Sequence, residues 1–317
     1  MRGRLSERLG ELWPPLGPDV AIAHRFVRPP YGGSNQFLLA LRGELQRRGL
    51  AVAPNRIGRR TRACLMNAFL FDSERIGRQR RPGCRMVHRV DGPVGLYRGS
   101  DDGTDAEVAR INAALADATV FQSQFSLDAS RSLGLELAAP TVIMNAVDPR
   151  IFHPGERAPL SGDRVRIVST SWSSNPNKGA AVYEWLDRNL DLSRFDYTFV
   201  GQSPVEFERI RAVPPVGSRE LAALLREQDV YLTASANDPC SNALLEALAC
   251  GLPALYLDSG GHPEIVGDGG LPFTAAEEIP GQLDRLVAGY AERRAAIAIP
   301  TLAEVADRYL EVMGLGA

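Results

Sequence analysis

Lysine is nearly missing from this chain. Of its 36 basic side chains, 35 are arginines and one, Lys178, is a lysine. Because the lysine ammonium is a compact point charge that suits phosphate groups, its retention at one position suggests a specific anionic partner. A lone lysine can also fall on a solvated surface by chance, so the residues around Lys178 must decide between the two interpretations.

Long apolar runs and closely paired cysteines are also lacking. No run approaches the roughly 20 apolar residues of a membrane-spanning helix, and the amino terminus lacks the apolar core of a secretion signal. The four cysteines are widely spaced, at positions 64, 84, 240 and 250, with no CxxC pair. This spacing favours free thiols in a reducing compartment. We therefore predict a cytoplasmic protein, with a peripheral position at the inner face of the membrane as the alternative.

Several ligand-binding motifs are absent. No GxGxxG follows the first predicted strand and no GxxxxGK[ST] occurs, which argues against nicotinamide-dependent dehydrogenases and P-loop kinases. The chain also lacks the Asp-x-Asp triplet that many metal-dependent sugar transferases use, and no histidines and cysteines have metal-ligand spacing. We expect neither a metal site nor a bound cofactor.

Charge is unevenly distributed, although the net charge is only −2. Residues 1–100 hold 19 arginines and 7 acidic residues, a balance of +12, whereas residues 101–317 have a balance of −14. A basic half favours an anionic partner, such as a membrane surface, a phosphorylated acceptor or nucleic acid. Equally, the two halves can neutralise each other across their interface. Nucleic acid ranks last because no aromatic residues interleave with a basic face.

Apolar runs alternate with helical patterns along the whole chain. In the first half, strands are predicted near 20–23, 63–71, 85–90, 118–121 and 141–144, and helices near 34–48, 73–80, 105–115 and 124–132. In the second half, strands are predicted near 165–170, 196–200, 229–232 and 254–257, and helices near 178–190, 218–226, 241–250, 280–297 and 302–313. An amphipathic pattern over 1–14 favours a helix packed on the protein over one lying on a membrane.

This alternation predicts the α/β class, with two Rossmann-like, doubly wound parallel sheets. The turn-rich residues 145–155 separate an amino-terminal domain, 1–150, from a carboxy-terminal domain, 151–317. Ligands of such sheets bind at the carboxyl ends of the strands, so we expect the two domains to face each other across a cleft.

Residues 229–264 form the most informative stretch, DVYLTASANDPCSNALLEALACGLPALYLDSGGHPE. A strand, a polar loop and a helix follow one another there, an arrangement that suits nucleotides and other anions. Asp238 precedes the helix and is either a cap or a ligand contact. Glu246 lies two turns into the same helix. It is either an exposed helix residue or an acceptor of hydrogen bonds from a diol such as that of ribose. Gly260 and Gly261 form a turn or let backbone N–H groups approach a ligand.

Two further residues follow predicted strands. Lys178, in SWSSNPNKG, opens a helix, where a cation opposes the helix dipole. A nearby anion would explain that choice better than a solvated surface position does. His88, in VHRVDGP, stands near the end of a strand and is followed by Asp91 and Gly92. This position favours a role in the cleft, although a lone histidine is often structural and His24, His153 and His262 compete.

Together these motifs resemble retaining glycosyltransferases of the GT-B fold, in glycosyltransferase family 4. The resemblance is strongest from Asp238–Pro239 through EALACGLP to GGHPE, which is similar to the family pattern EPFG…EAMACGxPV…GGxxE. Supporting matches are Gly32-Gly33 in the first loop, NAVD with Phe152 and Pro154 at the linker, and Lys178-Gly179. HRVDGP, NAALADATVFQS and SWSSNPNKG resemble a branch within the family.

The resemblance implies roles for these residues. Glu246 would bind the donor ribose, Asp238 would contact the transferred sugar, and Lys178 would neutralise the leaving diphosphate. His88 would line the cleft beneath the donor sugar, and Gly32–Gly33 would approach the phosphate or the acceptor. The remaining donor-binding candidates are Ser173, Gly260, Gly261 and His262. The final helix would return to the amino-terminal domain.

Three positions depart from the family pattern. Asp238 is one methylene shorter than the usual glutamate, Ser173 stands where an arginine is common, and Ala146 replaces a glycine. The resemblance implies transfer of a sugar, with retention at the anomeric carbon, from a nucleotide-diphosphate sugar to an acceptor hydroxyl. The acceptor is a glycan, a lipid-linked molecule or a small molecule, and it meets the Arg-rich half if it is anionic or membrane-associated. A catalytically silent GT-B protein that binds a nucleotide or a glycan is the alternative that the departures favour.

Overall fold

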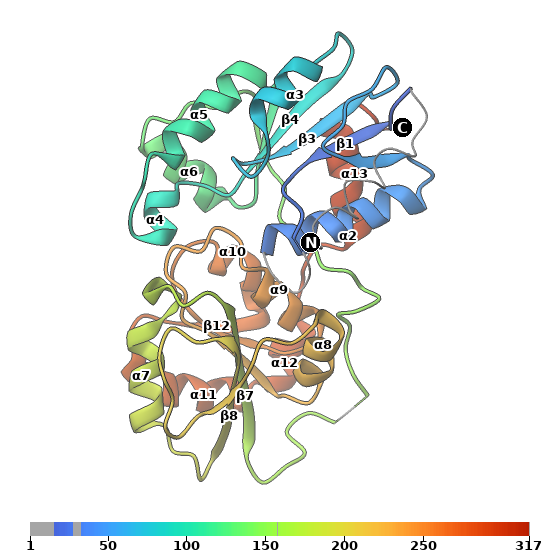
Figure 1. Cartoon of the computed structure of the whole chain (residues 1–317). Helices are drawn as coiled ribbons and strands as arrows, with labels where there is room; N and C mark the ends of the chain where they lie inside the picture. The colour runs from blue at the N-terminus through green and yellow to red at the C-terminus, as the bar shows by residue number, and fades with distance from the viewer. Residues whose placement is uncertain (1–15, 28–32, 157, 317) are drawn as a thin grey trace, which may run out of the picture.

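The computed structural model consists of two six-stranded parallel sheets flanked by helices (Figure 1). It describes residues 16–27, 33–156 and 158–316. The predicted amphipathic helix over 1–14 and the candidate residue Gly32 lie outside the described residues.

The first sheet has the strand order β2-β1-β3-β4-β5-β6, and every neighbouring pair is parallel. Its strands are β1 (Val20–Ala23), β2 (Val52–Pro54), β3 (Ala63–Asn67), β4 (Arg85–Val90), β5 (Ala118–Phe121) and β6 (Pro140–Val142). Its helices are α2 (Gly33–Arg47), α3 (Ser73–Gln79), α4 (Val94–Arg98), α5 (Thr104–Leu115) and α6 (Gln124–Ser132). The inner strands β1, β3, β4 and β5 are buried along nearly their whole length because helices cover both faces of the sheet.

The second sheet has the order β12-β11-β10-β7-β8-β9 and is also parallel throughout. Its strands are β7 (Val165–Trp172), β8 (Phe195–Gln202), β9 (Arg211–Val213), β10 (Val230–Thr233), β11 (Ala254–Leu257) and β12 (Gly270–Phe273). Its helices are α7 (Ala180–Asn189), α8 (Ser218–Arg226), α9 (Asn242–Ala249), α10 (His262–Val266), α11 (Ile279–Ala288) and α12 (Tyr290–Ala295). The predicted two-sheet α/β architecture is therefore confirmed.

The structure corrects several element boundaries. The helix predicted over 280–297 is two helices, α11 and α12, which meet at Gly289. Lys178 does not open α7 but ends a short 3₁₀ turn (Pro176–Lys178), which the Asn175 side chain caps. The structure adds the short strands β2, β9 and β12, of three or four residues each, to those predicted.

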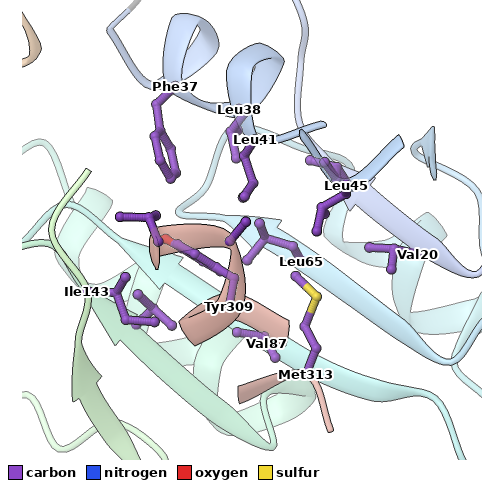
Figure 2. Packing of buried hydrophobic residues seen from close by; sticks show 14 of the residues in the cluster. Val20, Phe37, Leu38, Leu41, Leu45, Leu65, Val87, Ile143, Tyr309 and Met313 are labelled. Carbon is purple, nitrogen blue, oxygen red and sulfur yellow. The ribbon is translucent and has the colours of Figure 1, made fainter. Parts of the chain in front are cut away.

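The last helix, α13 (Leu302–Val312), returns to the first sheet, as predicted (Figure 1). A capping box at Thr301 and Glu304 begins it. Figure 2 shows Tyr309 and Met313 pointing into the core that the α2 leucines share with strand residues such as Val87. This packing joins the carboxyl end of the chain to its first half.

Several hydrogen bonds connect the two halves near the strand ends. The carboxylate of Glu264, in α10, accepts from the backbone N–H groups of Gln124 and Phe125, each at 2.7 Å, at the start of α6. The Asn145 side chain donates to Asn242 Oδ1 at 2.9 Å. The Asn175 side chain donates to the backbone oxygen of Arg98 at 3.2 Å. Of these residues, Arg98 and Asn242 also line the cavity described below.

The described ranges hold no helix that is long and apolar enough to cross a bilayer. Within them, no three histidine, cysteine, aspartate or glutamate side chains gather in a way that could hold a metal ion. All four cysteines are buried free thiols.

Candidate active site

A cavity of about 500 Å³ opens between the two halves. The first half contributes His24, Arg25, Gly33, Asp91, Tyr97 and Arg98 to its wall. The second half contributes Trp172, Ser173, Lys178, Asp238, Asn242 and Glu246. The cavity therefore brings together five of the residues proposed from the sequence, Gly33, Ser173, Lys178, Asp238 and Glu246, which come from three stretches of the chain.

Lys178 and Asp238 are in direct contact, although 60 positions separate them. Lys178 Nζ donates to Asp238 Oδ2 at 2.7 Å, and the side chains are 29% and 10% exposed. Burial alone would raise the pKa of Asp238, but the Lys178 charge and a hydrogen bond from the Cys240 backbone N–H outweigh it and lower that pKa. The Asp238 carboxylate is therefore ionised at neutral pH, and both residues line the cavity.

The loop that carries Asp238 rests on the paired glycines. A Cβ added to Gly260 would lie 2.5 Å from the backbone oxygen of Asp238, and one added to Gly261 would lie 2.4 Å from that of Pro239. Gly260 also has a positive φ of 65°. Neither glycine lies in the cavity wall, so their structural effect is to let this turn pack closely behind the Asp238 loop.

Replacing Gly260 with alanine should therefore displace Asp238. We expect a stability loss of about 1–3 kcal/mol, from the left-handed backbone and the collision, together with weaker nucleotide binding. Gly267→Ala is the matched control, because Gly267 also has a positive φ, 49°, but a Cβ added there would meet nothing within 4 Å. Thermal unfolding and nucleotide titration measure both effects. Equal nucleotide affinity in the two variants would contradict the role assigned to Gly260.

Glu246 is a buried carboxyl group without a partner. Its side chain belongs to α9, the residue is 6% exposed, and Oε2 has no hydrogen-bond partner among the described residues. Burial raises its pKa to about 8, so the protein on its own holds the neutral acid at pH 7. A buried polar atom without a partner is costly, and a ligand hydroxyl that donates to it would remove that cost.

His88 does not line the cavity, contrary to the prediction. It is 0% exposed, its Nε2 bonds to the backbone oxygen of Ala68 at 2.8 Å, and its Nδ1 bonds to the Asn112 side chain at 3.1 Å. Burial lowers its pKa to about 4. The strand β4 continues two residues beyond His88, which therefore lies inside the sheet.

His24 is the histidine that reaches the cavity. It follows β1 directly, lines the wall, and bonds through Nδ1 to the Asn67 side chain at 3.2 Å. Burial lowers its pKa to about 4, so it is a neutral imidazole. The rule that ligands bind at strand ends applies to His24 more directly than to His88, because no strand residue follows it.

The remaining candidates divide into two groups. Gly33, the first residue of α2, and Ser173, just after β7, both line the cavity. A Cβ on Gly33 would lie 2.9 Å from Asn242 Nδ2, so the glycine lets α2 approach α9. His262 is 0% exposed and donates through Nδ1 to the Leu257 backbone oxygen at 3.1 Å. It lies behind the Asp238 loop with the paired glycines.

A second cavity of about 530 Å³ adjoins the first. Gln36, Asn242 and Glu246 line both cavities. The second one continues toward the linker residues 146–148 and the start of α8 at Ser218, and its other walls are largely apolar. Glu246 thus stands where the two cavities meet.

Comparison with known proteins agrees with this architecture. Residues 181–289, which span most of the second half, match the family model described as Glycosyl transferases group 1. The fold is GT-B, the two-sheet architecture of a class of glycosyltransferases. A curated relative, D-inositol 3-phosphate glycosyltransferase of Streptomyces avermitilis, is 31% identical over 105 residues. That match covers 33% of this chain and 22% of the relative.

Solved structures resemble the chain over nearly its full length. Sucrose-phosphate synthase from Thermosynechococcus elongatus has a TM-score of 0.72 at 14% identity, with 92% of this chain and 97% of the other covered. Anabaena HepE in complex with UDP-glucose has a TM-score of 0.64 at 13% identity, and the match covers 94% of this chain and 97% of the other. The catalytic domain of starch synthase IV from Arabidopsis thaliana, bound to ADP and acarbose, has a TM-score of 0.65 at 11% identity. That match covers 93% of this chain and 98% of the other. At such identities the likeness concerns the fold alone.

Proposed function

We propose that this protein is a retaining glycosyltransferase of family 4, which moves a sugar from a nucleotide-diphosphate sugar to an acceptor hydroxyl. The observation that carries the proposal is the meeting of Lys178, Asp238 and a partnerless buried Glu246 at one cavity between two parallel sheets. Ligands of open α/β sheets bind at this edge. The donor is a substrate, and we propose no metal and no bound cofactor.

The donor would lie across the wall of the second half. The ribose hydroxyls would donate to Glu246, because its Oε2 is buried and lacks a partner. The diphosphate would face Lys178, and the transferred sugar would face Asp238. Since Glu246 lines both cavities, the base would extend into the largely apolar second cavity.

The chemical difficulty of this reaction is the departure of a nucleoside diphosphate. The Lys178 ammonium would stabilise the charge that develops on the leaving oxygen, in a site that excludes water. Because Lys178 already pairs with Asp238 at 2.7 Å, donor binding must redistribute this ion pair between the diphosphate and the sugar. Retention would follow from attack on the face that the diphosphate leaves, with the acceptor proton departing on the diphosphate.

The acceptor would meet the Arg-rich first half of the chain. Arg25 and Arg98 line the cavity from that half and are exposed. We propose a hydroxyl acceptor that is anionic or membrane-associated, and a cytoplasmic enzyme that reaches the inner face of the membrane when its acceptor is there.

A panel of nucleoside diphosphates tests the donor site directly. UDP, GDP and ADP at 100 times their Kd should each add roughly 3 kcal/mol of stability if they bind, so at least one should raise Tm by several degrees. The matching nucleosides, which lack the diphosphate, serve as controls and should have a much smaller effect. No shift with any diphosphate would contradict the proposal.

A further inference from the structure

Asp91 is an acidic residue at the cleft that donor binding does not use. It directly follows β4, within the HRVDGP sequence, and its side chain is 20% exposed. It lines the cavity from the first half, whereas Lys178 and Asp238 line it from the second. Its carboxylate therefore belongs to the acceptor side of the cavity.

Two side chains hold Asp91 through one of its oxygens. Arg89 Nη1 donates to Asp91 Oδ1 at 3.0 Å, and Gln122 Nε2 donates to the same oxygen. The other oxygen, Oδ2, has no hydrogen-bond partner among the described residues. Ser126 Oγ donates to the Asp91 backbone oxygen at 3.0 Å. The residue is thus immobilised with one carboxylate oxygen free, at a position that borders the cavity.

The arginine that holds Asp91 is itself fully buried. Arg89 is 0% exposed, and it also donates to Asn67 Oδ1 at 2.7 Å and to Asn145 Oδ1 at 3.0 Å. Removing a guanidinium from water is unfavourable unless it is paired and hydrogen-bonded. Asp91 supplies the negative charge that pairs with it, so the buried cation and the cleft carboxylate form one unit.

This unit extends to the donor helix. Asn145, which accepts from Arg89, donates to Asn242 Oδ1 at 2.9 Å. Asn242 is the first residue of α9 and lies one turn before Glu246. A hydrogen-bonded chain therefore connects the carboxylate on the acceptor side with the helix that carries the proposed ribose-binding group.

The space between Asp91 and the donor residues is lined by Tyr97. Burial raises the pKa of Tyr97, and the negative charges of Asp91 and Asp238 raise it further. The tyrosine thus lies within the field of both carboxylates, one from each half of the chain. An acceptor placed beside Tyr97 would be within reach of both sides of the cleft.

We propose that Asp91 binds the acceptor and that Arg89 positions it. Asp91 Oδ2 accepts a hydrogen bond from an acceptor hydroxyl other than the attacking one, so the acceptor is polyhydroxylated, as a sugar or a cyclitol is. The inference rests on the proposed glycosyl transfer. In that step the attacking oxygen bonds to the anomeric carbon while the bond from that carbon to the diphosphate breaks. The proton of the attacking hydroxyl departs on the diphosphate, and Asp91 takes no part in this proton transfer.

The test separates transfer to a sugar from transfer to water. The substrates are the nucleotide sugar whose nucleotide stabilises the protein most, with a panel of methyl glycosides as acceptors. Asp91→Asn should lower kcat/KM for the glycosides about 10- to 100-fold, the loss expected when a hydrogen bond to a charged group is removed. Donor hydrolysis by water and nucleotide affinity should stay within about threefold of wild type. Asp128→Asn, an acid on α6 with a 59% exposed side chain, should change none of these values.

Four other results would decide against the proposal or against the function on which it rests. Glycoside transfer within threefold of wild type in Asp91→Asn would overturn the proposal, and so would an equal loss of transfer, hydrolysis and nucleotide binding. Wild-type protein that hydrolyses the donor but glycosylates no glycoside would also contradict it. If Asp91→Asn fails to fold, Asp91→Glu, which keeps the charge beside Arg89 but displaces the carboxylate, should show the same selective loss. Wild-type protein that binds no nucleotide would instead remove the proposed function itself.

Discussion

Replacing Lys178 with methionine is expected to lower the turnover number about 10²- to 10³-fold, the effect of removing one electrostatic contact to a leaving group or oxyanion. Methionine keeps most of the apolar stem and removes the only lysine charge of the chain. The substitution leaves Asp238 unpaired, and since the Lys178 side chain is 29% exposed, we expect a stability loss of only about 1–2 kcal/mol, below that of a fully buried pair. Turnover should therefore fall far more than stability.

Two companion variants make this result interpretable. Lys178→Met with Asp238→Asn removes the whole ion pair, so it should recover stability but not turnover. Arg188→Met removes a cation from the following helix, where the side chain is 74% exposed, and should leave turnover unchanged. Steady-state release of nucleoside diphosphate and thermal unfolding measure the two effects separately. Wild-type turnover in Lys178→Met would exclude the diphosphate role.

Replacing Glu246 with glutamine should weaken donor binding about 10- to 100-fold. Hydrogen bonds to a charged acceptor are roughly twice as strong as neutral ones, and a ribose diol would donate two of them. The control is Glu184→Gln on α7, where the side chain is 49% exposed. Calorimetric titration with the nucleotide gives both affinities, and an unchanged affinity in Glu246→Gln would place the ribose elsewhere.

The pH dependence of donor binding is a second test of the role of Glu246. Its pKa is about 8 in the protein on its own, so ribose hydroxyls that favour the ionised form should make donor binding release a proton at pH 7. Wild-type affinity should rise with pH by up to about tenfold per unit until pH 8, whereas the affinity of Glu246→Gln should lack this contribution. Titration in buffers of different ionisation enthalpy detects the released proton.

The raised pKa of Glu246 also affects the stability of the protein without donor. Donor affinity should rise with pH, whereas this stability should fall. Because the folded-state pKa, about 8, lies above the ordinary value of 4.5, the unfolded chain binds fewer protons between these two values. The contribution of Glu246 to stability is therefore complete below pH 4.5 and is lost as the pH rises to about 8. Glu246→Gln removes this loss, so the variant should be more stable than wild type at pH 8 while binding donor less tightly.

Much of this architecture could be predicted from sequence because its signals are local. The alternation of apolar runs and helical patterns indicated both sheets and the returning helix α13. The EALACGLP segment indicated Glu246 as a site residue. The presence of a single lysine among 35 arginines indicated Lys178, the residue that contacts Asp238. Lys178 follows a predicted strand and precedes Gly179, and Glu246 lies in a helix that Gly251 ends, so both signals lie within a few residues of the site residue.

The remainder depended on tertiary packing. The histidines are an exception, because the predicted strands 20–23 and 85–90 have the bounds of β1 and β4 and already place His24 after one strand and His88 inside the other. Asp91 directly follows the predicted strand 85–90, but the sequence does not show what holds it there, because Arg89 is buried and is bonded to Asn145, 56 residues away in sequence. The helix predicted over 280–297 is interrupted at Gly289. Apolar periodicity alone does not predict this break.

Release of nucleoside diphosphate from nucleotide sugars tests the central claim most directly. Wild-type protein and Lys178→Met would be incubated with UDP-, GDP- and ADP-sugars, with and without methyl glycosides, while the released diphosphate is quantified and the anomeric configuration of the product is read by NMR. We predict release by wild type with at least one donor, a product of retained configuration, and a loss of about 10²-fold or more in the variant. Tight nucleotide binding without release from any donor would instead identify a catalytically silent GT-B protein.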